Sequence, residues 1–231
     1  MEQLMKNPGT EGWYAPYVAI RTDCYLILAS LLGQAPSEAM IATLQNLQWD
    51  ETAPGKLARA LDRLRRAARL GTQTAIAAEF NRLFVGMGCG EMVPYASWYR
   101  ERKIQSSPLA SLRGDLIRLG LVKRPESCEA EDHAGALCEV MALLSRETGG
   151  ASPAAQADFF RKNVASWLMR FFRDLRVAKN ASFYRVVSSL GVCFLESESE
   201  YLEVEIATQL PIPKGGLHNE TRNHRHPADV L

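Results

Sequence analysis

Apolar residues recur at intervals of three and four positions along nearly all of the 231-residue chain, and no segment alternates convincingly at every second position. The first spacing places apolar side chains on one face of an α-helix, whereas alternation is typical of a strand. Glycine and proline residues separate the periodic segments and so indicate where helices end. The sequence therefore predicts an all-α fold, a single helical domain of about eight to ten helices.

Capping residues set the helix boundaries in the N-terminal half. A first helix is expected over residues 16–32, and a shorter one after Ser37, whose hydroxyl can cap it. A third helix starts at Lys56, carries arginines on its solvent face and ends at Gly71. The next helix starts at Thr72. We expect these helices to pack through their apolar stripes.

Four further helices are expected, over residues 107–119, 127–146, 154–177 and 182–201. The segment 147–153, ETGGASP, could be a hinge across which the last helices exchange between two subunits. Residues 1–205 are predicted to form one domain. Residues 206–231, which contain proline, glycine and polar residues without periodicity, are predicted to be a flexible tail.

The charge balance argues against nucleic acid as a partner. Lysine and arginine number 27 against 26 acidic residues, a formal net charge of +1, which supplies no global field for holding phosphate backbones. The five cysteines show no Cys-x-x-Cys spacing and mostly fall inside apolar helical patterns. We interpret them as reduced core residues of a cytoplasmic protein.

Neither a secretion signal nor a membrane span is predicted. The N-terminal sequence MEQLMKNPGT has no basic segment followed by the apolar stretch of a signal peptide. The longest apolar run, around Leu26, falls short of the roughly 20 residues that cross a bilayer. We therefore expect a cytoplasmic protein without stable membrane insertion.

Two groups of residues could suggest a bound ligand. The three glycines within residues 86–90 could cradle a phosphate, but no Lys-Ser/Thr pair follows them, so a helix C-cap and a flexible loop is the favoured interpretation. The three histidines within residues 218–226 are common metal ligands, yet we interpret them as incidental residues of the tail. No cofactor and no metal site is predicted.

The acidic segment ESCEAEDH, residues 126–133, is predicted to occupy the first turns of the helix 127–146. Acidic residues there complement the helix dipole, which is the purely structural interpretation. At about 100° per residue, Asp132 and His133 could instead face a groove, and an acidic, partly apolar groove suits a cationic, partly hydrophobic peptide. A catalytic pair is disfavoured, because adjacent helical residues diverge too far for their side chains to hydrogen-bond easily.

Three segments resemble the signature of the TorD/DmsD/NarJ family of molybdoenzyme maturation chaperones. RLFVGMG is similar to the family's R-L-F-x-G-P-G, VPYASWY to its P-P-Y-x-S-x-Y, and EAEDH to its E-P-x-D-H. The matching positions are Arg82, Leu83, Phe84, Gly86, Gly88, Pro94, Tyr95, Ser97, Tyr99, Glu129, Asp132 and His133. The chain departs from the pattern at Met87, Glu91, Val93, Ala130 and Asn163, which weakens assignment to a subfamily.

The resemblance implies a chaperone that binds the twin-arginine signal peptide, the apo form of the catalytic subunit of a molybdenum-cofactor oxidoreductase, or both. It implies that the protein itself catalyses no reaction. It also implies that the protein assists cofactor insertion and delays export of the client until the client has folded. By position it implies signal-peptide-binding roles for Leu83, Phe84, Tyr95, Tyr99, Asp132 and His133. Both a monomer and a homodimer are compatible with the sequence. The alternative hypothesis is a small-molecule or nucleotide-dependent enzyme that uses the glycine loop and His133.

Overall fold

The computed structural model describes residues 11–49, 55–85, 90–101, 107–123, 129–146 and 148–209. Over these residues the regular structure is helical apart from one isolated bridge between Tyr95 and His133, which confirms the all-α prediction. The elements are α1 (Glu11–Gly33), α2 (Glu38–Gln45), α3 (Gly55–Leu70), α4 (Gln73–Phe80), the π-helix η1 (Asn81–Val85), α5 (Ala96–Glu101), α6 (Ser107–Arg118), α7 (Ala134–Leu144), α8 (Pro153–Phe159), the π-helix η2 (Phe160–Ala165), α9 (Ser166–Val177) and α10 (Phe183–Gln209).

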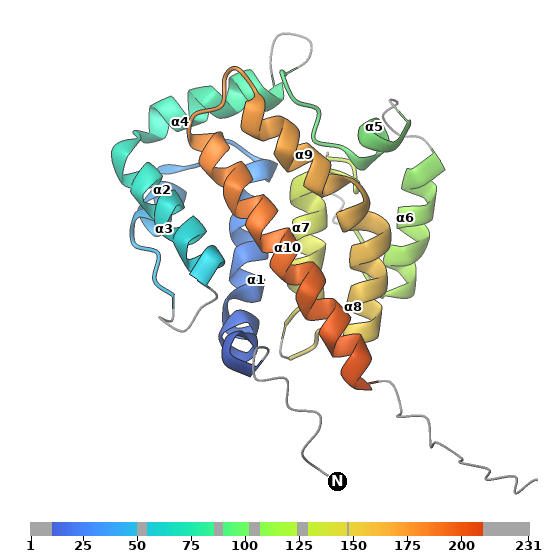
Figure 1. The fold of residues 1–231 in the computed structure, drawn as a ribbon. Coiled ribbons are helices and arrows are strands. Elements are labelled where there is room, and N and C mark those ends of the chain that lie inside the picture. The colour runs from blue at the N-terminus through green and yellow to red at the C-terminus, as the bar shows by residue number, and fades with distance from the viewer. Residues whose placement is uncertain are drawn as a thin grey trace, which may run out of the picture.

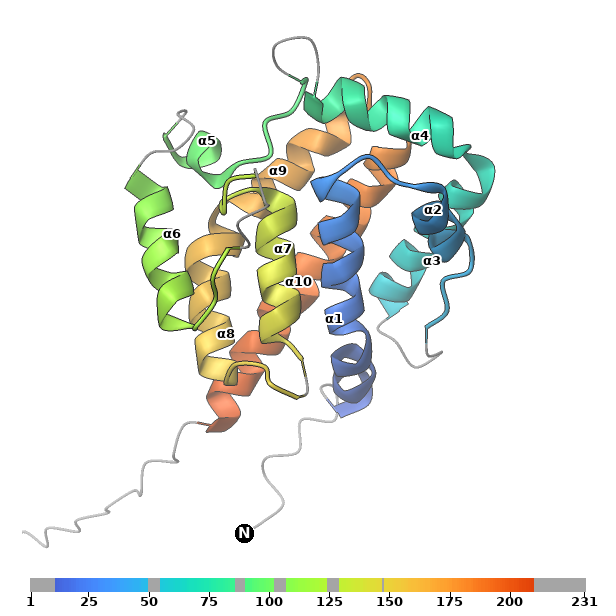
Figure 2. The same cartoon turned by 180° about the vertical axis from the view of Figure 1, so that it is seen from behind.

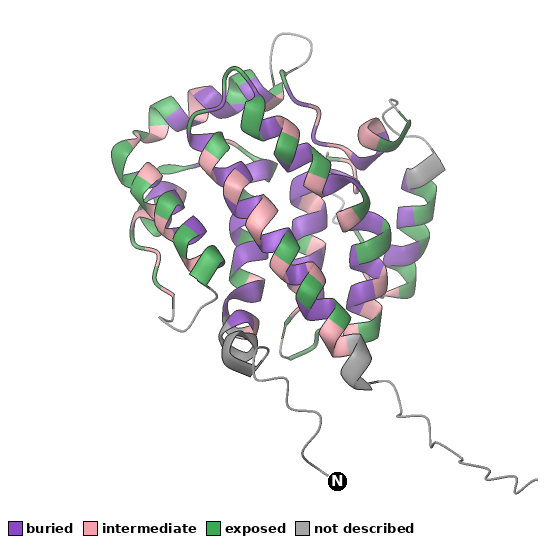
Figure 3. Ribbon diagram, in the orientation of Figure 1, coloured by how far each residue is buried: buried purple, intermediate pink, exposed green. Residues whose placement is uncertain are grey.

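Helix α10 runs diagonally across the front of the molecule, with α3 packed on one side and α8 and α9 on the other (Figure 1). Seen from behind, α1 and α7 lie side by side and pack closely (Figure 2). Buried residues concentrate where these helices face one another (Figure 3). The core is thus enclosed by α1, α7, α9 and α10, and α5 and α6 lie at one edge of the molecule.

Helices α1 and α7 pack antiparallel. At one end, Gly135 at the start of α7 meets the end of α1 so closely that a Cβ atom there would lie 2.9 Å from the Gly33 nitrogen. At the other end, the hydroxyl oxygens of Thr22 and Ser145 are 2.9 Å apart and share a hydrogen bond. A glycine is therefore needed at position 135, because any side chain would push the two backbones apart.

A buried ion pair joins α1 to α10. Glu198 is fully buried and accepts hydrogen bonds from Arg21 Nε at 2.7 Å and from the Tyr17 and Tyr25 hydroxyls at 2.7 and 2.8 Å. Arg21 also donates to Glu198 Oε1, from Nη2 at 2.5 Å and from Nε at 2.9 Å, so each carboxylate oxygen has more than one donor. Such complete pairing is what allows a charged side chain to remain in a protein interior.

Several predicted helix boundaries are confirmed. The hydroxyls of Ser37 and Thr72 accept from the backbone N–H groups of Met40 and Ala75, at 3.2 and 3.3 Å, so both residues are N-caps as expected. Helix α3 ends at Leu70, directly before Gly71. The predicted helix 154–177 corresponds to α8, η2 and α9, which follow one another without a break.

The helix predicted over residues 127–146 is shorter than expected. Helix α7 starts only at Ala134, and His133 is its N-cap, with extended backbone angles φ −67° and ψ 141°. Before the helix, the His133 N–H closes a turn onto the Ala130 carbonyl, and the Asp132 carbonyl accepts from the Ala96 N–H. Cys128 and residues 124–127 lie outside the described residues.

The expectations for the linker, the tail and the cysteines are only partly covered by the described residues. Helix α10 continues to Gln209, beyond the expected boundary at 205, while 210–231, Cys89 and the glycines at 86 and 88 lie outside the described residues. Cys24, Cys138 and Cys193 are free thiols, as expected. In the described part of the chain, no helix is both long and apolar enough to cross a membrane.

Candidate functional site

The segments that carry the PYASWY and EAEDH motifs are bound to each other through their backbones. The Ala96 N–H donates to the carbonyl of Asp132 at 3.0 Å, and the Ala134 N–H donates to the carbonyl of Pro94 at 2.8 Å. The Asp132 carboxylate also accepts from the Ser97 N–H at 2.9 Å and thereby caps the start of α5. The two motifs therefore join α5 to α7.

Asp132 and His133 are only 1% and 5% exposed, so the expectation that both face a groove is wrong. That expectation assumed that they lie within the helix. Instead, His133 Nδ1 accepts from the Gly135 N–H at 3.1 Å, and its ring meets that of Tyr95 edge-on, with centroids 5.1 Å apart. Both side chains are occupied in holding the segment that precedes α7.

Burial lowers the pKa of His133 below its ordinary value of 6.5, and nearby Glu129 and Asp132 offset only part of this shift. As the pH falls through about 6.5, His133 therefore takes up a proton in the unfolded state but not in the folded state. The free energy of unfolding is therefore highest above this pH and decreases below it. We expect wild-type protein to lose stability relative to the His133→Asn variant as the pH falls from 7.5 to about 5. Urea unfolding at several pH values tests this.

Asparagine at position 133 keeps a side-chain acceptor for the N-cap but cannot take up a proton. Titrations of other groups are common to both proteins and cancel in the comparison. A difference in unfolding free energy that stays constant across this pH range would contradict the buried neutral imidazole.

Phe84 and Tyr99 lie in a different environment, an aromatic cluster around Phe171. Leu83 is fully buried, and the half-buried rings of Phe84 and Tyr99 lie 6.4 and 6.0 Å from the ring of Phe171. Phe84 also meets Tyr184 edge-on at 5.3 Å. Of the six predicted site residues, the structure thus brings Phe84 and Tyr99 together around Phe171, brings Tyr95, Asp132 and His133 together as a second group, and buries Leu83.

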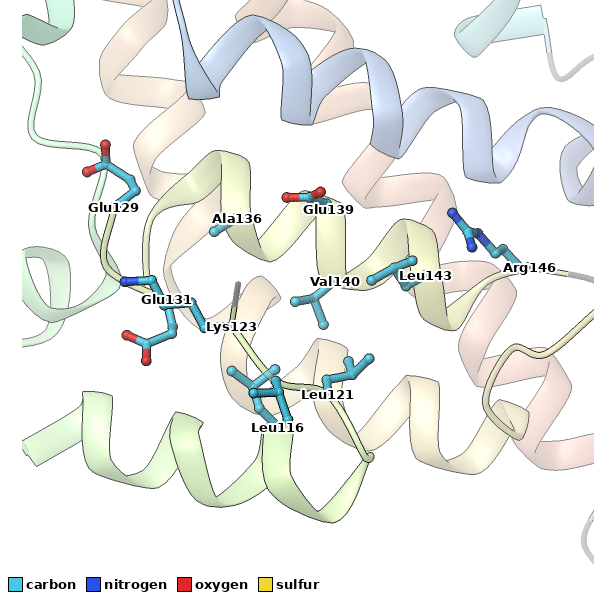
Figure 4. A pocket seen from close by; sticks show the side chains of 11 residues that line it. Leu116, Leu121, Lys123, Glu129, Glu131, Ala136, Glu139, Val140, Leu143 and Arg146 are labelled. Carbon is cyan, nitrogen blue, oxygen red and sulfur yellow. The ribbon is translucent and has the colours of Figure 1, made fainter. Parts of the chain in front are cut away.

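A cleft of about 620 Å³ opens next to the second group, between α6 and α7. Its apolar lining comes from both helices and from the chain that follows α6, namely Leu116, Leu121, Val122, Ala136, Val140 and Leu143. Figure 4 shows Leu116 and Leu121 facing Val140 across the opening. Val122 is 89% exposed, so part of this apolar surface is open to solvent.

Acidic residues line one end of this cleft. Figure 4 shows Glu129 and Glu131 at the end where α7 begins, and Arg146 at the opposite end. The Tyr95 hydroxyl donates to Glu129, and burial together with this carboxylate raises the pKa of Tyr95. Arg113 pairs with Glu131 at 2.9 Å and holds the pKa of that carboxyl below its usual range.

Sequence reasoning missed the apolar lining of the cleft. The buried stripe of α7 includes Leu137, Cys138 and Met141, whereas Ala136, Val140 and Leu143 form a second apolar stripe on another face of the same helix. A helix that is apolar on more than one face must either be buried on all sides or border a binding surface. This second stripe was the signal in the sequence that could have indicated the cleft.

Known proteins show similarity over most of this chain. Residues 31–173 match the family model described as nitrate reductase delta subunit. Chaperone protein TorD of Aliivibrio salmonicida is 26% identical over 147 residues, which cover 59% of this chain and 68% of that protein. Chaperone protein TorD of Actinobacillus pleuropneumoniae serotype 3 is 25% identical over 77% of this chain and 94% of its own.

A crystal structure described as a redox enzyme maturation protein from Archaeoglobus fulgidus has the same fold, with a TM-score of 0.54 at 17% identity over 77% of this chain and 94% of its own. The family match and the relatives named as TorD chaperones identify the chain as a protein of the chaperone class. The chain belongs to the nitrate reductase delta subunit family, the TorD/NarJ family of chaperones. The resemblance seen in the sequence is thereby confirmed.

Proposed function

We propose that this chaperone binds the twin-arginine signal peptide of a molybdenum-cofactor oxidoreductase in the cleft between α6 and α7. It also engages the apo form of the catalytic subunit in the cytoplasm, and assists cofactor insertion. A signal peptide held in this cleft is not accessible to the export machinery, so export waits until the client has folded. The observation that carries the proposal is the cleft, which has an apolar lining and, at the end where α7 begins, the carboxylates of Glu129 and Glu131 together with Lys123.

The chemistry of the cleft matches the two parts of such a peptide. Paired arginines would meet Glu129 and Glu131, where each charged hydrogen bond contributes about 1.5 to 3 kcal/mol. The apolar stretch that follows the arginines would lie along Val140 and Leu143, toward the end of α7. Burial there contributes about 25 cal/mol for each Å² of apolar surface removed from water.

The six residues implied by the resemblance receive different roles in this proposal. Tyr95 donates to Glu129 and so orients a carboxylate that faces the peptide. Asp132 and His133 act indirectly, because they are buried and fix the segment that presents Glu129 and Glu131. The aromatic cluster that contains Phe84 and Tyr99 is proposed as a second contact for the client, and Leu83, which is fully buried, acts only indirectly.

Calorimetric titration with a synthetic twin-arginine signal peptide from a molybdoenzyme of the same source tests the proposal. We expect micromolar binding by the wild type, and binding weaker by at least about tenfold for the double variant Glu129→Gln, Glu131→Gln. The matched control is Glu196→Gln, Glu200→Gln, which removes two exposed charges from α10 and should leave binding unchanged. A Lys-Lys version of the peptide should bind more weakly, because lysine lacks the planar fork of arginine.

A parallel titration with the folded apo catalytic subunit separates two forms of chaperone action. Binding to the apo subunit without binding to the peptide would contradict signal recognition in the cleft and indicate action on the body of the enzyme. Failure with both ligands would refute the proposal as a whole. Equal weakening by the two double variants would show that overall charge, not the cleft, governs binding.

A further inference from the structure

Glu131, at the acidic end of the cleft, already binds a guanidinium group of the same chain. Arg113 Nε lies 2.9 Å from Glu131 Oε1, and Arg113 Nη2 lies 3.1 Å from Glu131 Oε2, which is a two-point contact. Two parallel N–H···O bonds are the arrangement in which a carboxylate best recognises arginine. The chain thus places one of its own arginines where the proposed peptide would place one of its arginines.

The two partners of this pair differ in exposure. The Glu131 side chain is 14% exposed and lines the cleft, whereas the Arg113 side chain is 56% exposed on α6 and does not line it. An exposed arginine gains little from an ion pair and loses little when it turns into water. Arg113 can therefore leave without disturbing the core, while Glu131 stays in place to receive another donor.

We propose that Arg113 is an internal competitor for the cationic end of the bound peptide, an inference that rests on the proposed function. Binding exchanges the Arg113 guanidinium for that of the peptide at Glu131, and release is completed when Arg113 returns. A chaperone must let go of its client, and a competitor tethered at the site keeps the lifetime of the complex short. Affinity differences of this kind appear mostly in the dissociation rate.

Other charged residues near Glu131 do not compete with the peptide in the same way. Lys123 also lies close enough to favour the charged form of Glu131, but no hydrogen bond between their side chains is found among the described residues. Arg118 lies more than one helical turn beyond Arg113 on α6 and forms an ion pair with Asp115. Asp115 in turn accepts from Asn163 at 2.9 Å, and neither Arg118 nor Asp115 lines the cleft. Arg118 therefore provides a matched control.

The test compares peptide binding and dissociation for wild type, Arg113→Gln and Arg118→Gln. Arg113→Gln should bind the twin-arginine peptide about two- to fivefold more tightly, with the gain in a slower dissociation rate. Arg118→Gln removes the same charge from the same helix and should match the wild type. In the Glu131→Gln background, Arg113→Gln should no longer tighten binding, because the contested carboxylate is gone.

The outcomes separate this inference from the proposed function. Binding of equal strength by wild type and Arg113→Gln, or equal gains from Arg113→Gln and Arg118→Gln, would overturn the competitor and leave peptide recognition intact. Binding by the wild type that becomes tighter in Arg113→Gln but not in Arg118→Gln would support both. Absence of binding by either protein would refute peptide recognition and the competitor together.

Discussion

Replacing Glu198 by alanine is expected to destabilise the protein by about 3 to 5 kcal/mol, because removing one partner of a buried pair leaves the other charge uncompensated. Arg21 is 3% exposed and would keep its charge in the interior, and the Tyr17 and Tyr25 hydroxyls would lose their acceptor. For a domain of this size, such a loss lowers the melting temperature by about 6 to 20 °C. Urea and thermal unfolding followed by circular dichroism measure both quantities.

A second comparison isolates the unpaired charge as the cause. The variant Glu198→Gln keeps an acceptor for the tyrosine hydroxyls but leaves the buried charge of Arg21 without a counter-charge. The double variant Glu198→Gln, Arg21→Met removes both charges. The double variant should be more stable than the single one, since neutral replacements of a buried ion pair are tolerated. Glu200→Ala, on the exposed side of α10, should change stability by less than about 0.5 kcal/mol. A Glu198→Ala variant as stable as Glu200→Ala would contradict the assigned role.

Glu79→Ala should produce the second large effect, a loss of about 2 to 4 kcal/mol. Glu79 lies on α4 and is buried, yet its carboxylate accepts from three successive backbone N–H groups at the start of α10, those of Ser182, Phe183 and Tyr184, at 2.8, 3.1 and 2.8 Å. The first N–H groups of a helix have no partner within the helix, and a negative charge there also complements its dipole. Removing this carboxylate leaves donors unpaired in the interior.

Glu91 supplies the control for Glu79, because it performs a similar task on the surface. Its carboxylate accepts from the backbone N–H groups of Lys179 and Asn180, at 2.5 and 3.0 Å, but is exposed to solvent. Water can replace it, so Glu91→Ala should cost less than about 1 kcal/mol. Amide hydrogen exchange of residues 182–184 should accelerate only in Glu79→Ala. Equal effects of the two variants on stability would show that burial is not what makes Glu79 important.

The sequence by itself largely determined where the helices lie along the chain. Periodicity, the caps at Ser37 and Thr72 and the stop before Gly71 act within a few residues of chain, so each can be recognised locally. The motifs around Tyr95 and Asp132 likewise indicated the family. The same local reasoning could indicate that α7 is apolar, but not which of its faces would border a cleft.

The tertiary structure alone decided what the key side chains do. Asp132 and His133 were expected in a helix, but backbone pairing with residues 94–97 holds them before it and buries them, and no periodicity encodes that pairing. The hydrogen-bond partners of Glu198 and Glu79 are more than a hundred residues distant in sequence, so local patterns cannot indicate them. Only the fold buries these two glutamates against their partners and so makes them important for stability. The cleft arises in the same way, since two helices that the sequence describes separately form a binding surface only when packing brings them together.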